Sequence, residues 1–383
     1  MTEIFLTIFF ISVLLFFLGS GIWVALSMIG VSAIGMMLFT SRPVGDAMAT
    51  TIWGTSSSWT LTALPLFVWM GEILFRTKLS ENLFKGLSPW MQKLPGGLIH
   101  VNIVGCALFA AISGSSAATV ATVGKMSIPE LRKRNYPEKI LLGSLAGSGT
   151  LGLLIPPSII LIIYGVAVQE SIAKLFIAGI IPGIMIAIIF MSYVIIWSLI
   201  NKKEMPKILE EYSFLEKVKR STQLLPVILL ILAVIGSIYT GVATATEAAS
   251  LGVVGALILS YFQKSLTLET FKSSLLGATK TSCMIAFILA GSTFLSLAMG
   301  FTGLPRNLAI WIQNMDLSPY VLIFVLMIFY IILGMFLDGI SAVVLTMAII
   351  EPMIRQAGFD MIWFGIFLVI VVEMAQITPP VGF

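Results

Sequence analysis

The chain has 383 residues, of which 58% are hydrophobic and only 10% are charged, and its mean hydropathy is +1.05. A soluble domain carries about 25% charged residues, so this composition excludes a soluble protein and predicts an all-α polytopic membrane protein. The formal net charge of +4 suits basic cytoplasmic loops and gives no indication of nucleic-acid binding. With a single histidine and two cysteines in apolar runs (Cys106 and Cys283), no metal cluster, disulfide or cofactor is expected.

The apolar runs predict membrane helices of roughly 20 residues each. The first run lacks the basic start of a signal peptide, because its only early charge is Glu3, and we interpret it as the first membrane helix. Shorter amphipathic segments are expected to lie along the membrane interface and frame a scaffold, with ordinary surface loops as the alternative. The expected membrane helices span 4–19, 21–40, 59–77, 138–168, 171–200, 223–241, 243–262, 280–300 and 361–383, and the amphipathic segments span 43–58, 80–93, 265–279 and 303–316.

Two further apolar stretches, 96–129 and 320–354, contain Ser/Gly-rich breaks near their middles. Because of these breaks, both stretches are too polar at the centre to cross the membrane at low energetic cost, which predicts that they form re-entrant hairpins. The first stretch has basic flanks, which places both of its ends in the cytoplasm. The second has a net acidic neighbourhood, which places its ends on the outside face. The flanking charges are Lys85, Lys93, Arg132, Lys133, Arg134 and Lys139 for the first hairpin, and Asp316, Glu351, Arg355 and Asp360 for the second.

Together these elements predict two inverted structural repeats. Residues 1–200 form the first repeat, with hairpin 96–129, broken helix 138–168 and closing helix 171–200. Residues 201–222, rich in lysine, form a cytoplasmic linker. Residues 223–383 form the second repeat, with hairpin 320–354 and a broken helix that starts at 361. Five full crossings in the first repeat invert the second, which agrees with the opposite charges beside the two hairpins.

Each repeat contains a hairpin break followed by a Pro-Pro break. The spacing is 42 residues from Gly114 to Pro156 and 40 residues from Gly339 to Pro379. Broken backbone at membrane depth is tolerated only where protein buries it or where it lines a watery cavity. Matching breaks in two inverted halves indicate a secondary transporter.

The breaks are rich in oxygen atoms, which a hard cation such as sodium prefers. Proline cannot donate the helical hydrogen bond, so carbonyls one turn earlier lose a donor, and helix ends add partial charges that suit an ion or an anionic solute. Asp338 is a carboxylate at membrane depth, which by default suggests a function. The candidate substrate- and ion-binding residues are Ser113, Gly114, Ser115, Ser116, Thr119, Gly149, Thr150, Pro156, Pro157, Ser158, Asp338, Gly339, Ser341, Thr378, Pro379, Pro380 and Gly382. Sodium is expected near Ser113, Ser115 and Pro156 as the first site, and near Asp338, Ser341 and Thr378 as the second.

Structural interpretations of the same residues remain open. Serine and glycine in membrane helices often permit close packing, and a Pro-Pro pair can be a simple kink. Asp338 can cap the hairpin limb that follows it, because aspartate is a favoured N-cap residue. The duplication of the whole set favours the functional interpretation.

Several distinctive motifs follow one another along nearly the whole chain. They are Leu-Pro-Gly-Gly at 94–97, Phe-Ala-Ala-Ile-Ser-Gly-Ser-Ser-Ala-Ala-Thr at 109–119, Ile-Pro-Glu-Leu-Arg-Lys-Arg at 128–134, Gly-Thr-Leu-Gly at 149–152 with Ile-Pro-Pro-Ser at 155–158, the segment 174–183, Phe-Leu-Asp at 336–338 and Ile-Thr-Pro-Pro-Val-Gly at 377–382. Together and in this order, they specifically resemble the motifs of the large membrane subunit of tripartite ATP-independent periplasmic (TRAP) transporters.

This resemblance implies a sodium-coupled symporter in a bacterial or archaeal inner membrane, surrounded by membrane lipid, that imports a carboxylate-bearing solute of the organic-acid or sialic-acid type. It implies a periplasmic solute-binding protein that delivers the solute, and a small TRAP membrane subunit. It also implies an elevator-type fold, in which hairpins and broken helices move against a scaffold. Family members continue past the second Pro-Pro-Val-Gly, so the second repeat is expected to be truncated at the C-terminus and the sequence to be a fragment.

Other functions are less well supported by the residues. An uncoupled channel, or a stand-alone sodium/dicarboxylate transporter without a binding protein, would use similar broken helices. An enzyme is not expected, since the sequence contains no catalytic or metal-binding motif. The absence of a phosphate-binding loop argues against an ATP-driven pump.

Overall fold

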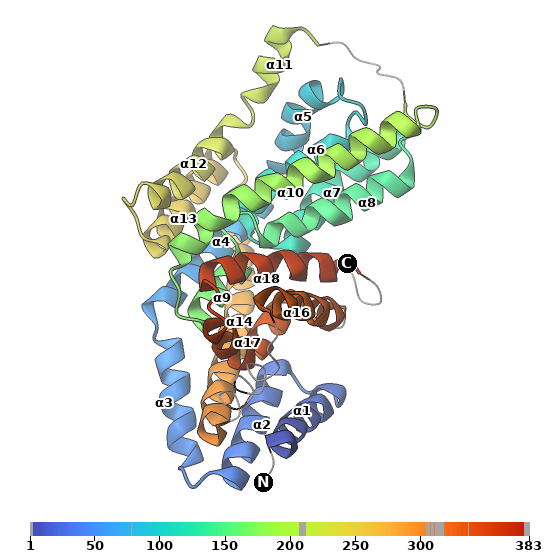
Figure 1. Ribbon diagram of the computed structural model, residues 1–383. Coiled ribbons are helices and arrows are strands. Elements are labelled where there is room, and N and C mark those ends of the chain that lie inside the picture. Colours follow the sequence, from blue (N-terminus) through green and yellow to red (C-terminus); the bar gives the residue numbers. More distant parts are fainter. Residues whose placement is uncertain are drawn as a thin grey trace. The chain divides into compact units, whose positions relative to one another are not determined.

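The computed structural model describes residues 3–77, 79–206, 212–303, 307, 310, 318–335 and 337–378. Every regular element in these ranges is a helix, as Figure 1 shows, which confirms the predicted all-α fold. The chain divides into two compact units, each described here by itself. Both units draw on both halves of the sequence, so this division differs from the predicted repeats 1–200 and 223–383 without testing them.

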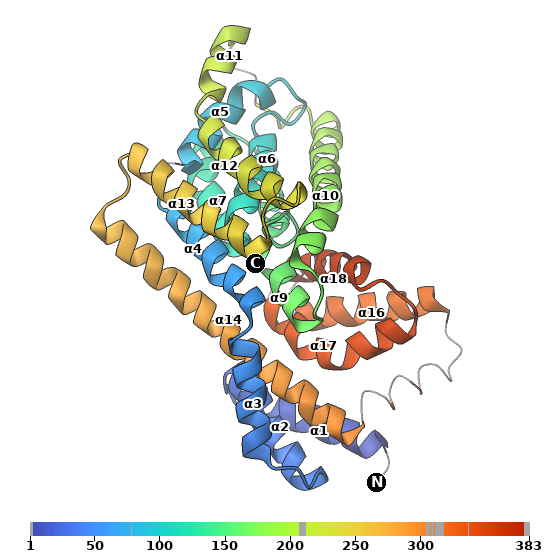
Figure 2. The ribbon, with the colours of Figure 1, turned by 90° about the vertical axis from the view of Figure 1, so that its left-hand side faces the viewer.

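The first unit comprises Met1–Thr62, Ile162–Ser171 and Thr281–Gly382. Within it α1 packs on α2, and α16 and α17 both contact α18 (Figure 2). Its elements are α1 (Glu3–Gly19), α2 (Val24–Phe39), α3 (Val44–Ser56), the 3-10 turn η1 (Trp59–Thr62), most of α9 (Ile159–Ala167), the second part of α14 (Leu268–Thr302), α16 (Pro319–Gly334), α17 (Gly339–Gln356) and α18 (Met361–Gln376).

The second unit comprises Ala63–Leu161 and Ile172–Lys280, with Phe383. Here α4 packs on α13, the helices α6, α7 and α8 lie against one another, and α10 contacts α6 and α8 (Figure 1). Its elements are α4 (Ala63–Phe75), α5 (Leu79–Met91), α6 (Ile99–Ser113), α7 (Ser116–Lys133), α8 (Glu138–Gly149), η2 (Thr150–Leu153), the start of α9, α10 (Ile172–Ile200), α11 (Phe214–Ser221), α12 (Leu225–Tyr239), α13 (Ala245–Phe262) and the first part of α14.

Two pairs of helices occupy the predicted hairpins. The helices α6 and α7 have 15 and 18 residues and meet at the Ser/Gly break. The helices α16 and α17 have 16 and 18 residues and meet at the break before Asp338. At 1.5 Å per residue, α6 and α16, with 15 and 16 residues, are roughly 22–24 Å long, which is shorter than the ~30 Å hydrocarbon core. The helix α17, with 18 residues, is long and apolar enough to cross a membrane.

The prediction of a separate amphipathic segment at 265–279 is wrong. That segment and the expected crossing 280–300 form one continuous helix, α14, of 35 residues. The run from Leu268 to Thr302 contains no proline, and isolated glycines cost only about 1 kcal/mol each in a helix. A change from amphipathic to apolar character therefore does not end this helix. Most of the expected segment 303–316 lies outside the described residues.

Several expected membrane crossings are short. Among the described residues, four helices are long and apolar enough to cross a membrane (α10, α13, α14 and α17), or up to six if each of two bent pairs forms one span. Others, such as α1 and α18, have 17 and 16 residues. The helix α1 ends at Gly19, before Ser20 and Gly21, and α18 ends at Gln376.

Candidate functional site

The tip of the first hairpin depends on a glycine. Gly114 ends α6 in the left-handed region, with φ 60° and ψ 12°, where side chains other than glycine are strained. A Cβ added at Gly114 would lie 2.6 Å from the Pro157 carbonyl oxygen. The Ile159 N–H donates to the Gly114 carbonyl at 3.4 Å. The hairpin tip is therefore in direct contact with the Pro-Pro break.

Three predicted residues form a cluster of oxygen atoms at this tip. The Ser113 and Thr119 hydroxyls lie 3.0 Å apart, and both side chains are buried. The Ser115 carbonyl accepts from the Thr119 hydroxyl at 2.7 Å and from the Thr119 N–H at 3.0 Å. The Ser115 hydroxyl caps α7 by accepting from the Ala118 N–H. The cluster holds the tip together and gathers oxygens that a cation could use.

The first Pro-Pro break contains a 3-10 turn, Thr150–Leu153, between α8 and α9. Gly152 in this turn has no room for a Cβ, which would lie 2.8 Å from the Ser115 carbonyl carbon. The peptide bond between Pro156 and Pro157 is cis. The Ser158 hydroxyl donates to the Leu153 carbonyl and accepts from the Leu161 N–H. One carbonyl before the prolines therefore has a side-chain donor in place of the missing backbone one.

The other predicted members of the first site contact the oxygen cluster at the hairpin tip less directly. The Thr150 hydroxyl donates to the Gly147 carbonyl at 2.8 Å, within its own helix turn. A Cβ on Gly149 would lie 2.0 Å from the Val120 side chain, so this glycine permits close packing of α8 on α7. Ser116 begins α7 beside the backbone of Gly152.

In the second half, Asp338 is the N-cap of α17. Its carboxylate accepts from the Ser341 N–H at 3.1 Å, and the side chain is exposed, whereas Ser341 is buried. The geometry of Asp338 is therefore that of a helix cap, as in the structural interpretation of this residue. The Thr378 hydroxyl donates to the Met374 carbonyl at 2.7 Å, and in the part of the chain that the structure describes no hydrogen bond joins Thr378 to Asp338. The predicted residues Pro379, Pro380 and Gly382 lie outside the described residues.

The caps reveal the register of the two halves. Ser115 caps α7 and Asp338 caps α17, 223 positions apart (338 − 115). The same separation relates the prolines inside these helices, Pro129 and Pro352. It also relates the first residues of α8 and α18, Glu138 and Met361, and the Pro-Pro pairs that begin at 156 and 379. Matching the two halves by their tip glycines is two positions out, since Gly114 and Gly339 are 225 apart.

This register points to Glu373, a residue that the sequence reasoning missed. Glu373 stands 223 positions after Thr150 (373 − 150). Its side chain is 4% exposed, and its Oε1 atom has no hydrogen-bond partner among the described residues. Gln376, one turn later on α18, has a similarly unpartnered buried Oε1. A buried carboxylate within an apolar helix is energetically costly and therefore suggests a function by default. The repeat register was the signal that could have found it.

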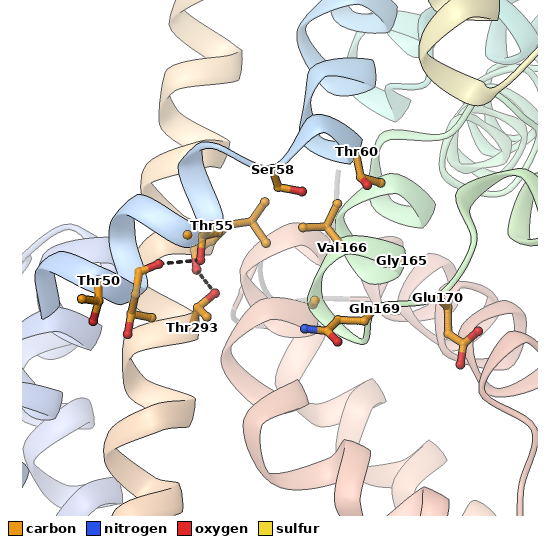
Figure 3. Close-up of a pocket in the computed structure, with 13 residues that line it drawn as sticks. Thr50, Thr55, Ser58, Thr60, Gly165, Val166, Gln169, Glu170 and Thr293 are labelled. Carbon is orange, nitrogen blue, oxygen red and sulfur yellow. Dashed lines mark hydrogen bonds between the residues drawn. The ribbon is translucent and has the colours of Figure 1, made fainter. Parts of the chain in front are cut away.

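The first unit also contains a cavity of about 490 Å³ that the sequence reasoning missed. Hydroxyl groups from α3 and α14 line one side, and Gln169 and Glu170, after α9, line the other (Figure 3). The hydroxyls of Thr51, Thr55 and Thr293 donate to carbonyls of their own helices, so they offer acceptor lone pairs to the cavity. In the sequence, the Thr/Ser-rich run at 50–60 was the feature that could have indicated this cavity.

Two contacts connect the end of α9 to the second-half helices within the first unit. The Arg355 guanidinium donates to the Val168 carbonyl at 2.9 Å and pairs with Glu351 at 2.9 Å and Glu170 at 3.6 Å. The Tyr164 hydroxyl donates to the Met361 carbonyl at 2.7 Å. These contacts join the broken helix of one half to the hairpin limb of the other.

The arrangement of helices has a counterpart among solved structures. The YdaH transporter of Alcanivorax borkumensis matches with a TM-score of 0.61 and 13% sequence identity, over 96% of this chain and 88% of that one. At this identity the likeness shows the fold alone. The apolar helices and this likeness define the chain as a polytopic α-helical membrane protein.

The family follows from sequence. Residues 9–383 match the family described as "Tripartite ATP-independent periplasmic transporter, DctM component", and the chain belongs to this family. It is similar to the C4-dicarboxylate TRAP transporter large permease protein DctM of Pseudomonas aeruginosa, with 33% identity over 91% of this chain and 81% of that protein. It is also similar to the sialic acid large permease SiaM of Vibrio cholerae, with 30% identity over 95% and 84%, and to the 2,3-diketo-L-gulonate large permease YiaN of Escherichia coli, with 31% over 88% and 78%.

The predicted family is therefore confirmed. The chain is a large TRAP permease, a multi-pass protein of the inner membrane and not an enzyme. The family description names a tripartite periplasmic system, which implies a small membrane subunit and a periplasmic binding protein.

Proposed function

We propose that this permease imports an organic acid anion together with sodium, and that a periplasmic binding protein delivers the solute while a small membrane subunit completes the translocator. The observation that supports this proposal most is the repeated cap, proline and Pro-Pro register, combined with the buried oxygen cluster at the first hairpin tip. Repeats of this kind place solute and ion sites at their broken helices.

The first sodium site would use the Ser113 and Thr119 hydroxyls and the Ser115 carbonyl, close to the first Pro-Pro break. The Ser113 and Thr119 hydroxyls keep a lone pair after the hydrogen bonds described above, whereas the Ser115 carbonyl already accepts two hydrogen bonds and would have to release one to bind a cation. The hydroxyl–hydroxyl contact at 3.0 Å brings two such oxygens close enough to share one ion after a small adjustment.

The second sodium site would lie near Asp338, Ser341 and Thr378, as the sequence suggested. Glu373 is a further candidate ligand, because it occupies the position of Thr150 in the other repeat and is buried with an unpartnered oxygen. A carboxylate there would compensate the charge of a bound cation and would in turn be stabilised by it.

The solute would be an anion. The N-terminus of α7 presents backbone N–H groups and positive partial charge, which favour an anionic group, whereas the N-terminus of α17 carries the Asp338 carboxylate, which favours a cation. The three relatives described above are named for a C4-dicarboxylate, sialic acid and 2,3-diketo-L-gulonate, which are all carboxylates. Movement of hairpins and broken helices past a scaffold, an elevator mechanism, would carry the solute across.

Uptake by the reconstituted full-length complex tests this proposal. Proteoliposomes with an inward sodium gradient and the binding protein should accumulate solute, and replacing sodium by potassium or omitting the binding protein should abolish accumulation. Accumulation that needs sodium but no binding protein would favour a stand-alone transporter. Solute flux that equilibrates without any ion gradient would favour an uncoupled channel.

A further inference from the structure

A second cavity, of about 260 Å³, lies within the second unit at the basic end of α10. Its walls come from the Leu-Pro-Gly-Gly turn after α5, from Tyr136 before α8, and from the last residues of α10 with the segment that follows them. The surrounding lysines and arginines predict that this end of α10 faces the cytoplasm. None of these residues belongs to the hairpin tip, the Pro-Pro breaks or the hydroxyl-lined cavity.

Close packing fixes the walls of this cavity. A Cβ added at Gly96 would lie 2.6 Å from the Val194 side chain, so the turn sits directly on α10. Tyr136 packs on a buried cluster formed by Ile99, Ile103, Ile140 and Val194. The Leu98 N–H donates to the Tyr136 hydroxyl oxygen at 3.0 Å. The cavity is therefore built by the fold and not by mobile surface side chains.

The polar groups that line the cavity suit an anion. Lys93 and Lys202 are exposed at its edge, and neither has an ion pair among the described residues. Because the Tyr136 oxygen accepts a backbone hydrogen bond, its O–H remains able to donate to a ligand. Burial raises the pKa of Tyr136 above its usual value, so the proton is retained at neutral pH. No acidic side chain of the described residues lines the cavity.

The surface next to the cavity suits acyl chains. Leu199 lines the cavity and is 48% exposed, and Ile196 and Ile200 beside it are 58% and 76% exposed. They belong to α10, an apolar helix of 29 residues that is long enough to cross the membrane. Trp197 lies at the same level, and tryptophans are enriched where the hydrocarbon meets the headgroups. Charge at the mouth and apolar surface along the helix match an amphiphile better than a small soluble anion.

We propose that this cavity binds the phosphate headgroup of an anionic phospholipid, with Lys93, Lys202 and the Tyr136 hydroxyl as donors and the acyl chains along α10. Basic pockets between membrane helices on the cytoplasmic side are suited to such headgroups. This proposal does not depend on sodium coupling or on the identity of the solute.

Native mass spectrometry of the purified membrane complex tests the proposal, with phosphatidylglycerol and phosphatidylcholine as probes. Wild-type protein should retain phosphatidylglycerol in preference to phosphatidylcholine. The double variant Lys93→Gln/Lys202→Gln should bind phosphatidylglycerol about thirtyfold more weakly, which corresponds to about 2 kcal/mol. The matched control is Lys272→Gln/Lys280→Gln, which removes two exposed lysines from α14 and should bind as wild type does. Lys93→Arg/Lys202→Arg should retain binding.

Three results would overturn the proposal. Equal lipid retention by the Gln variant and its control would show that the cavity is not the site. Equal losses in the Gln and Arg variants would show that the lysines act through structure and not through charge. Displacement of phosphatidylglycerol by millimolar inorganic phosphate, or equal thermal stabilisation by phosphate alone, would assign the cavity to a small soluble anion.

Discussion

Gly114 shows how one residue determines the geometry of the first site. It adopts φ 60° and faces the Pro157 carbonyl so closely that a Cβ would lie 2.6 Å away. The hairpin tip can therefore contact the Pro-Pro break only when this position lacks a side chain. The serine hydroxyls on either side of the glycine are positioned by that contact.

Replacing this glycine should separate the tip from the break. Gly114→Ala should lower the melting temperature, because the left-handed conformation alone costs an ordinary residue about 1–2 kcal/mol and the clash with backbone adds to it. Gly143→Ala is the matched control, since Gly143 is exposed on α8 with nothing within 4 Å of an added Cβ, and it should leave stability unchanged or raise it slightly. Thermal unfolding of the two purified variants compares them. Equal melting temperatures would contradict the tip contact.

The Asp338 side chain both caps α17 and carries a negative charge. The substitution Asp338→Asn removes the charge and keeps a capping side chain. Asparagine caps helices about as well as aspartate, so the melting temperature should not change. Loss of the charged oxygen should raise the sodium concentration for half-maximal uptake, by roughly tenfold if binding weakens by about 1.4 kcal/mol. An unchanged sodium requirement would leave Asp338 with its capping role alone.

Glu373→Gln is the parallel test for the carboxylate that the repeat register identified. Glutamine keeps the size and removes the charge from a buried position with an unpartnered oxygen. Folding should survive, or improve, because desolvating a charge is costly, whereas the sodium requirement should rise. Sodium-dependent uptake at a series of sodium concentrations measures the effect. If uptake and sodium dependence are both unaffected, Glu373 is not a ligand.

At the scale of elements, the two helix pairs that meet at Ser/Gly-rich breaks and the interruption between α8 and α9 could be predicted from sequence, because Gly, Ser and Pro interrupt the apolar runs at these places. The register between the halves was missed because the tip glycines were matched to one another, although Pro129 and Pro352, and the two Pro-Pro pairs, are each 223 positions apart in the sequence. The caps at Ser115 and Asp338 have the same separation. The boundary inside α14 was predicted wrongly, because a change in polarity does not end a helix. The hydroxyl-lined cavity was not predicted because its walls come from elements that are distant in sequence, so that no single segment of the sequence indicates it clearly.

The contact between the end of α9 and α17 depends on Arg355, whose side chain is 46% exposed. Arg355→Ala should destabilise the protein by about 1–2 kcal/mol, because a charged hydrogen bond to the Val168 carbonyl is lost and partial exposure weakens the ion pairs. Arg132→Ala removes an exposed ion pair with Glu138 and should cost less than about 1 kcal/mol. Thermal unfolding should rank the two variants in this order, and the reverse order would show that the α9–α17 contact contributes little.

For the whole molecule, the predicted inverted topology places Arg134 and Lys217 in the cytoplasm and Asp316 and Gly358 outside. Single cysteines in a background without the two native ones should label accordingly with a membrane-impermeant reagent. Because Gly358 has φ 79°, the outside probe after α17 is better placed at the exposed Gln356. Labelling of positions 134 and 316 from the same side would refute the inverted repeat.

Sodium coupling is the central claim, and paired flux measurements test it most directly. Radioactive sodium and radioactive solute are followed together in proteoliposomes that contain the full complex, with the binding protein outside. We predict that solute entry is accompanied by sodium entry in a fixed ratio, and that both fluxes stop when the binding protein is omitted. Solute uptake with no accompanying sodium flux would contradict the proposed mechanism.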